Sequence, residues 1–195
     1  IFAFEFTPTL NFKCQQLDYH KRNLPDLSLK REYRYWAIEA LFRVRSSPLG
    51  SLLARFHSTP NIPSIHSFVS YPDKTDPQYI VMGNENLTMG RSNTLVAWYW
   101  RNFVQDGEKG KLTRTLSAHL LYSRQQNDVA NFTTYNRKTG VVTIQPVNVS
   151  GNWNGKANIG FSSPIDIAQH WWLELLAESS LLRTKTFLGT NEQGV

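Results

Sequence analysis

Side chains that commonly carry out enzyme chemistry occur in this sequence without the spacing that catalysis requires. The segment "GNENLTMG" at 83–90 lacks the Lys-Ser/Thr of a phosphate-binding loop, and no G-x-S-x-G nucleophile elbow occurs. The five histidines form neither an H-E-x-x-H nor a His-x-His pattern; they are His20, His57, His66, His119 and His170. We therefore predict that the chain is not an enzyme and has no catalytic residue, metal site or cofactor. The number of acidic residues, 15, does not by itself exclude a catalytic pair of carboxylates.

Ring-bearing side chains in the long connection at 59–91 are the candidates for ligand contact. His66, Tyr71 and Tyr79 could stack on sugars or on other rings. The alternative is that the same three side chains pack within the connection and meet no ligand. The sequence leaves both interpretations open.

Composition narrows the class of protein. The 195 residues suffice for one domain, and the net charge of +6 comes from scattered basic residues, the longest cluster being Lys30-Arg31 with Arg34. We interpret these residues as a solvated surface and predict no nucleic-acid partner. The single cysteine, Cys14, excludes an internal disulfide. No run of 18 apolar residues and no signal-peptide pattern occurs, which leaves a strand-built membrane protein open.

The segment "YRYWAIEALFRVR" at 33–45 combines helix-forming residue types with the period of a strand. Its apolar residues alternate strictly with others, which predicts one apolar face and one polar face. The apolar set is Trp36, Ile38, Ala40, Phe42 and Val44, and the opposite set contains Glu39, Arg43 and Arg45.

The same two-residue period predicts seven strands in all. They lie near 1–13, 33–45, 52–58, 92–103, 112–124, 152–162 and 171–184, although "LELLAES" in the last one also suits a helix. Trp98 and Trp100 share a face, and Trp36 and Trp171 lie near strand ends, as in the aromatic girdles of membrane barrels.

The connections alternate in length. "SSPLGS" at 46–51, "QDGEKG" at 105–110 and "SSPIDIAQ" at 162–169 are predicted hairpin turns, and long links lie at 14–32, 59–91 and 125–150. Long loops at one end and tight turns at the other are typical of an outer-membrane barrel. A soluble β-sandwich that binds carbohydrate through surface aromatics remains the alternative.

Two stretches show a resemblance to a known family. Residues 59–87 resemble a loop signature of TonB-dependent-receptor-like outer-membrane β-barrel proteins of Bacteroidetes, and residues 131–165 resemble that family's later loop and strand. The first match comprises Pro63, Ser64, Ile65, Asp73, Asp76, Pro77, Gly83, Asn84 and Leu87. The second comprises Thr139, Gly140, Pro146, Val147, Asn148, Gly151, Asn152, Trp153, Gly160 and Phe161. The sequence departs from the pattern at Glu85, where the family has Pro, and at Thr88-Met89, where it has Lys-Pro.

The resemblance implies an all-β fold, namely an antiparallel up-and-down meander within a large transmembrane barrel of the bacterial outer membrane. It also implies a plug domain, contact with TonB through an N-terminal part, outer-membrane lipid around the wall and a surface lipoprotein as a further partner. Such receptors take up scarce ligands such as glycans, siderophores or peptides.

The odd strand count, the lack of an initiator Met and the start at Ile1 within a strand pattern predict that residues 1–195 are a partial barrel domain without a plug. We expect strands 1–13 and 171–184 to be its two open edges.

Overall fold

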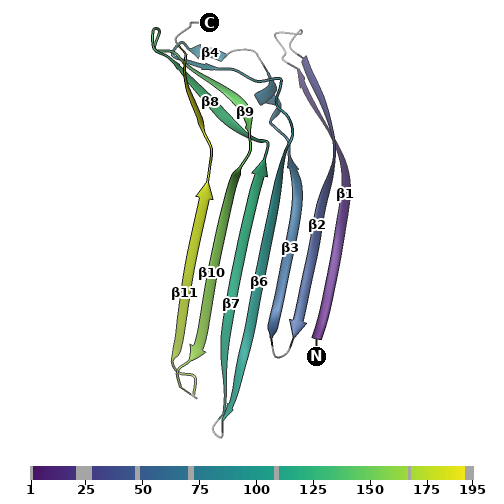
Figure 1. Cartoon of the computed structure of the whole chain (residues 1–195), viewed down its shortest axis with the longest axis vertical. Coiled ribbons are helices and arrows are strands. Elements are labelled where there is room, and N and C mark those ends of the chain that lie inside the picture. The colour runs from purple at the N-terminus through teal and green to yellow at the C-terminus, as the bar shows by residue number, and fades with distance from the viewer. Residues whose placement is uncertain are drawn as a thin grey trace.

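The fold contains two β-sheets and one short 3-10 helix. The computed structural model describes residues 2–20, 28–46, 49–69, 73–107, 110–166 and 168–191. A seven-stranded sheet has the spatial order β1-β2-β3-β6-β7-β10-β11, and every neighbouring pair in it is antiparallel (Figure 1). Its strands are β1 (Phe2–His20), β2 (Ser28–Ser46), β3 (Gly50–Asn61), β6 (Gly90–Gly107), β7 (Gly110–Gln126), β10 (Asn152–Pro164) and β11 (Trp172–Arg183).

The seven predicted strands are confirmed, including the segment at 171–184 that also suited a helix. The three predicted turns are confirmed as well, since β2 pairs with β3, β6 with β7 and β10 with β11 across short connections. The two-residue alternation of apolar side chains outweighed the helix propensity of "AIEALF" and "LELLAES" because propensity is a weak preference beside burial and pairing.

The predicted long link at 14–32 is wrong. β1 continues to His20, β2 begins at Ser28, and the two strands pair along their whole length from Phe2↔Ser46 to His20↔Ser28. Alternation fails as a signal there because the face that is apolar from Phe2 to Phe12 turns polar: Gln16 lies opposite Glu32, and Asp18 lies opposite Lys30. The apolar side chains of this segment, Leu17, Tyr19 and Leu29, lie on the other face. Backbone pairing continues although the apolar set changes face.

The two remaining long connections, together with the segment after β11, form a second sheet at one end of the first (Figure 1). Its order is β12-β8-β9-β5-β4, with parallel pairing of β12 to β8 and of β5 to β9. The helix η1 (Ile65–Phe68) precedes it. The strands are β4 (Asp73–Asp76), β5 (Tyr79–Val81), β8 (Asp128–Asn136), β9 (Val142–Val149) and β12 (Phe187–Asn191). No helix in the described residues is long and apolar enough to cross a membrane.

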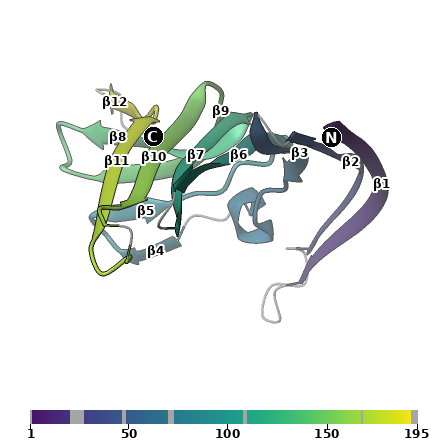
Figure 2. The same cartoon turned by 90° about the horizontal axis from the view of Figure 1, so that it is seen from below.

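The seven-stranded sheet is open. It curves between two free edges, β1 and β11, as the view along its strands shows (Figure 2). In the described residues no ladder joins these two strands, so the predicted open sheet is confirmed and no closed barrel is formed. Each edge leaves a row of backbone N–H and C=O groups without a neighbouring strand.

Very little of the molecule is a conventional core. Among the described residues, the buried hydrophobic side chains are Phe68, Leu87 and Val149, all near the second sheet. The accessible surface is 13694 Å², whereas a compact monomer of 22.4 kDa exposes roughly 9,400 Å². The excess belongs to a sheet whose faces and edges are uncovered.

Candidate functional site

The seven-stranded sheet has one continuous apolar face. Strand register carries the alternation of β2 across the sheet, so that Phe6, Phe42, Ala54, Ala97, Leu120 and Ala157 form one row, which ends at Ser179 on β11. The rows on either side are equally apolar. Phe4 lies level with Val44, Leu52, Tyr99, Ala118, Ile159 and Ala177, and Pro8 lies level with Ala40, Phe56, Leu95 and Tyr122. We call this surface the apolar face.

The apolar face is exposed and wide. Phe6 is 56% exposed, Leu120 45% and Ile159 57%, although each lies within a strand rather than at its end. Seven strands spaced about 4.8 Å apart, with an apolar stretch about 26 Å long on β2, give an area of roughly 800 Å². Typical soluble monomers have a largest apolar patch of about 300–600 Å².

The opposite surface, which we call the polar face, carries charged and hydrogen-bonding side chains. Arg43 pairs with Glu5 at 2.8 Å, and Arg55 pairs with Glu39 at 2.9 Å. Thr94 donates to Ser123, and Thr115 donates to Asn102. These pairs confirm that Glu39, Arg43 and Arg45 lie opposite the Trp36–Val44 set, because cross-strand neighbours share a face.

Trp98 and Trp100 share a face, as predicted, but that face is the polar one. The Trp98 ring stacks on His119 with centroids 5.4 Å apart. In register, Trp98 lies level with Leu53, and His119 lies level with Asn158. Placing these two tryptophans with Trp36 in one girdle was therefore wrong. β3 and β6 are separated by 28 residues of chain, and which of their side chains share a face depends on a pairing that the sequence does not reveal.

The predicted ligand residues lie on separate elements. His66 is on η1, where its ring meets the Tyr19 ring edge-on at 5.6 Å. Tyr79 begins β5 and is 51% exposed. Tyr71 lies outside the described residues. His66 thus takes part in packing η1 against β1, and Tyr79 keeps an open ring face.

The residues that carry the family resemblance meet in space. Asn84 donates to the Pro146 carbonyl at 2.9 Å, and Gln145 donates to the Gly83 carbonyl at 3.1 Å. Asn148 accepts from the backbone N–H of Thr88 at 2.7 Å and donates to the Thr88 carbonyl at 3.0 Å. The two long connections are therefore held together by motif residues and their immediate neighbours.

A glycine is required within this contact. A Cβ at position 83 would lie 2.2 Å from the Val69 carbonyl oxygen, closer than any side chain can approach backbone. Gly83 in turn donates its N–H to that oxygen at 3.0 Å. The close approach lets Phe68 and Leu87 become buried on either side of it.

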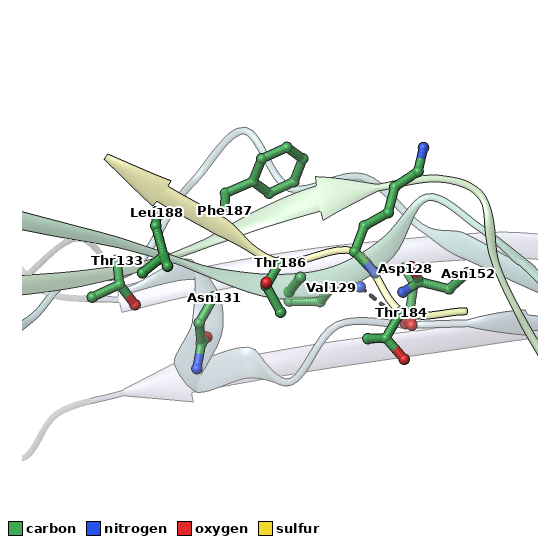
Figure 3. A pocket seen from close by; sticks show the side chains of 11 residues that line it. Asp128, Val129, Asn131, Thr133, Asn152, Thr184, Thr186, Phe187 and Leu188 are labelled. Carbon is green, nitrogen blue, oxygen red and sulfur yellow. Dashed lines mark hydrogen bonds between the residues drawn. The ribbon is translucent and has the colours of Figure 1, made fainter. Parts of the chain in front are cut away.

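An open groove of about 560 Å³ lies between β8 and the segment leading into β12 (Figure 3). Its charged groups already have partners within the chain. Asp128 accepts from Asn61 at 2.9 Å, and Lys185 donates to the Ser150 carbonyl at 2.8 Å. The carboxylate and the ammonium group are therefore both engaged within the chain, and the remaining polar side chains that line the groove, such as Asn131 and Thr186, are neutral.

The next feature concerns the side chains that could bind a metal or act as a nucleophile in the described part of the chain. No group of three or more His, Cys, Asp or Glu side chains converges there. Cys14 is exposed, and its thiol donates to Glu32 at 3.4 Å. The hydrogen bond from the N–H of Trp171 lowers the pKa of Asp166, which lies in the turn between β10 and β11. This carboxylate orders the turn.

The distinctive feature is therefore the pair of opposed faces, one apolar and one polar, on an open antiparallel meander. Sequence reasoning found the alternation but missed the second sheet and the contact between the motifs. In comparisons with known proteins, no family model, no curated protein and no solved structure matches this chain.

Proposed function

We propose that residues 1–195 are a section of the wall of a TonB-dependent-receptor-like protein in the bacterial outer membrane, with a role in ligand uptake rather than catalysis. The observation that carries this proposal is the continuous apolar face. Its large side chains are exposed in mid-strand while the reverse face is polar and ion-paired. A barrel wall between lipid and an aqueous lumen requires this arrangement.

The dimensions of the apolar face fit a bilayer. On β1 the apolar side chains run from Phe2 to Phe12, about 33 Å along the strand. A strand tilted by about 30–40° spans about 25–29 Å of membrane over that length, close to the height of the apolar band in outer-membrane barrels.

The apolar stretch also shifts along the strands from one edge of the sheet to the other. On β2 it runs from Trp36 to Val44, and on β11 it runs from Leu181 to Leu173. Leu181 is level with Ala40 rather than with Trp36. A shift of four residues, about 13 Å, over five strand spacings corresponds to a tilt of roughly 30°. A flat lipid layer crossed by tilted strands requires such a shift.

The open edges support a wall section that is completed by further strands. Lipid offers no hydrogen-bond partner, so the unpaired groups of β1 and β11 require neighbours on both sides. The rest of the same barrel would supply them, with a plug, TonB and a surface lipoprotein as further partners. The second sheet, at the end opposite the tight turns, would then form the loop region that meets ligand.

The alternative, a soluble carbohydrate-binding sandwich, requires a second layer over the apolar face. The described side chains of that face include Phe4 at 59% and Leu175 at 57% exposure, and the second sheet extends one end of the first. A sandwich core would instead bury both inner faces. The geometry therefore favours the membrane wall.

The test uses cysteine accessibility in the membrane. In a Cys14→Ser background, Leu120→Cys and Leu121→Cys place thiols on adjacent residues of β7 that face opposite sides. With the complete protein in outer-membrane vesicles permeabilised to small solutes, we expect a charged, water-soluble maleimide to label Leu121→Cys and to leave Leu120→Cys unlabelled. Equal labelling of both would overturn the proposal.

A further inference from the structure

A row of arginine and tryptophan lies at the end of the apolar face nearest the second sheet. Arg124 on β7 and Arg183 on β11 both lie opposite Trp153 on β10, so the three residues occupy one row across three adjacent strands. Tyr122, one row nearer the tight turns, meets the Trp153 ring with centroids 6.2 Å apart. Charged groups thus begin where the apolar residues end.

The two guanidinium groups have no acidic partner. Among the ion pairs of the described residues, none includes Arg124 or Arg183, and both side chains are exposed. On the other side of Arg124 lies Asn93, which is neutral. Lys185, two residues beyond Arg183, adds a further positive charge, and its ammonium group donates to the Ser150 carbonyl. Positive charge is therefore uncompensated along this row.

Another arginine near the same end of the face is neutralised. Arg34 on β2 lies beyond Trp36 on the same face, and its guanidinium donates to Glu32 at 2.7 Å. Arg91, level with Trp36 and Pro60, is turned back onto the sheet, where it donates to the Trp36 carbonyl and to the Ser58 hydroxyl. Arg124 and Arg183 differ from both because they remain available to an external anion.

We propose that Arg124, Trp153 and Arg183 bind the phosphate group of a membrane lipid whose acyl chains lie along the apolar face beside Tyr122 and Leu181. This inference rests on the proposed membrane location. Strands two apart are about 10 Å from each other, so two arginine side chains can close on one phosphate from both sides. Guanidinium binds phosphate through paired, charge-assisted hydrogen bonds. The indole between them lies at the depth where tryptophan favours the membrane interface.

The experiment measures lipid binding by the complete protein in an uncharged detergent, using calorimetric titration. The probes are a short-chain phosphatidic acid, the diacylglycerol with the same chains, and inorganic phosphate. We expect phosphatidic acid to bind at least tenfold more tightly than either of the others. Equal affinity for diacylglycerol would overturn the phosphate site, and equal affinity for inorganic phosphate would show an ion site in place of a lipid site.

Variants assign the binding to the row. Arg124→Gln with Arg183→Gln should weaken phosphatidic acid binding roughly 30-fold, about five- to sixfold for each arginine. The matched control Arg34→Gln should leave it unchanged, and the charge-preserving pair Arg124→Lys with Arg183→Lys should restore most of the affinity. Unchanged binding in the glutamine pair, or an equal loss in Arg34→Gln, would overturn the inference.

The two proposals fail in different ways. A protein that stays monomeric in water and binds no detergent would overturn the membrane wall itself. A detergent-dependent protein without a preference for phosphatidic acid would overturn the lipid site alone.

Discussion

A charge placed on the apolar face should destabilise the protein in lipid, and the same charge on the neighbouring residue should not. Leu120 is the position of choice because it lies in the middle row of the apolar face, between Ala97 and Ala157. It is 45% exposed, so a larger side chain meets no steric obstacle. Leu121, the next residue of β7, lies on the polar face between Val96 and Lys156.

The expected cost of Leu120→Arg is about 2–4 kcal/mol, the penalty for arginine near the midplane of a barrel wall. In water the same change at an exposed position would fall within about 0.5 kcal/mol of zero. Leu121→Arg brings a second cation beside Lys156, and a like-charge cross-strand pair costs up to about 1 kcal/mol. That repulsion destabilises the Leu121→Arg control and therefore makes the predicted difference in stability between the two variants smaller, not larger.

The assay is reversible unfolding in urea of the complete protein reconstituted in liposomes, followed by tryptophan fluorescence. The denaturation midpoint of Leu120→Arg should fall well below that of Leu121→Arg at an unchanged slope. Leu121→Gln serves as the uncharged control. If the two arginine variants lose the same stability, the assignment of the apolar face to lipid is refuted.

Three further perturbations test local features of the fold. Gly50→Ala should cost about 2 kcal/mol or more in unfolding free energy, because φ is +91° there and the new Cβ would lie 2.6 Å from the Trp100 carbonyl oxygen; a loss under about 0.5 kcal/mol would contradict this geometry. Asn148→Ala should make residues 82–89 more sensitive to proteolysis, since it removes the hydrogen bonds that join the two long connections, and unchanged cleavage would show that these bonds do not restrain the segment. The lowered pKa of Asp166 means that its contribution to stability is present above its ordinary value of 3.8 and is lost as pH falls through the lower folded-state value. Hydrogen exchange of the Trp171 amide, corrected for the intrinsic exchange rate, should therefore accelerate on acidification of the unmodified protein. In Asp166→Asn the corrected exchange rate should not depend on pH in this range.

The sequence predicts the parts of the fold in which one face is apolar. All seven long strands follow from alternation, because a strand with one polar face and one apolar face has polar and apolar residues in turn along its sequence. The ends of β1 and β2 were missed because Gln16 and Glu32 lie on the face that is apolar farther along the hairpin, so the apolar set does not continue on one face. β9 lies in the segment 125–150 that was predicted to be a link. Pro146 lies within β9, and proline normally argues against a strand.

The candidate site could be predicted only in part. The residue types on each face of a single strand follow from the sequence, but the joining of those faces across the sheet depends on register. Trp98 illustrates this limit, since its partner His119 is 21 positions away and is brought to it by the β6–β7 hairpin. The unpaired state of Arg124 and Arg183 likewise depends on which acidic side chains lie near them, and this emerges only from the assembled strands.

The second sheet has a consequence for the order in which the chain folds. Four of the six pairings in the seven-stranded sheet join strands that follow one another in the chain, so each can form as its hairpin closes. The other two pairings, β3 with β6 and β7 with β10, close excursions of about 28 and 25 residues. β5, in contrast, pairs with β9 across more than 60 residues, from Tyr79↔Val142 to Val81↔Ile144. Closing so long a loop is entropically costly and becomes favourable only after the intervening strands have brought its ends together. We therefore expect the long hairpins to form first and the joined connections to assemble last, which makes the second sheet a late reporter of correct strand order.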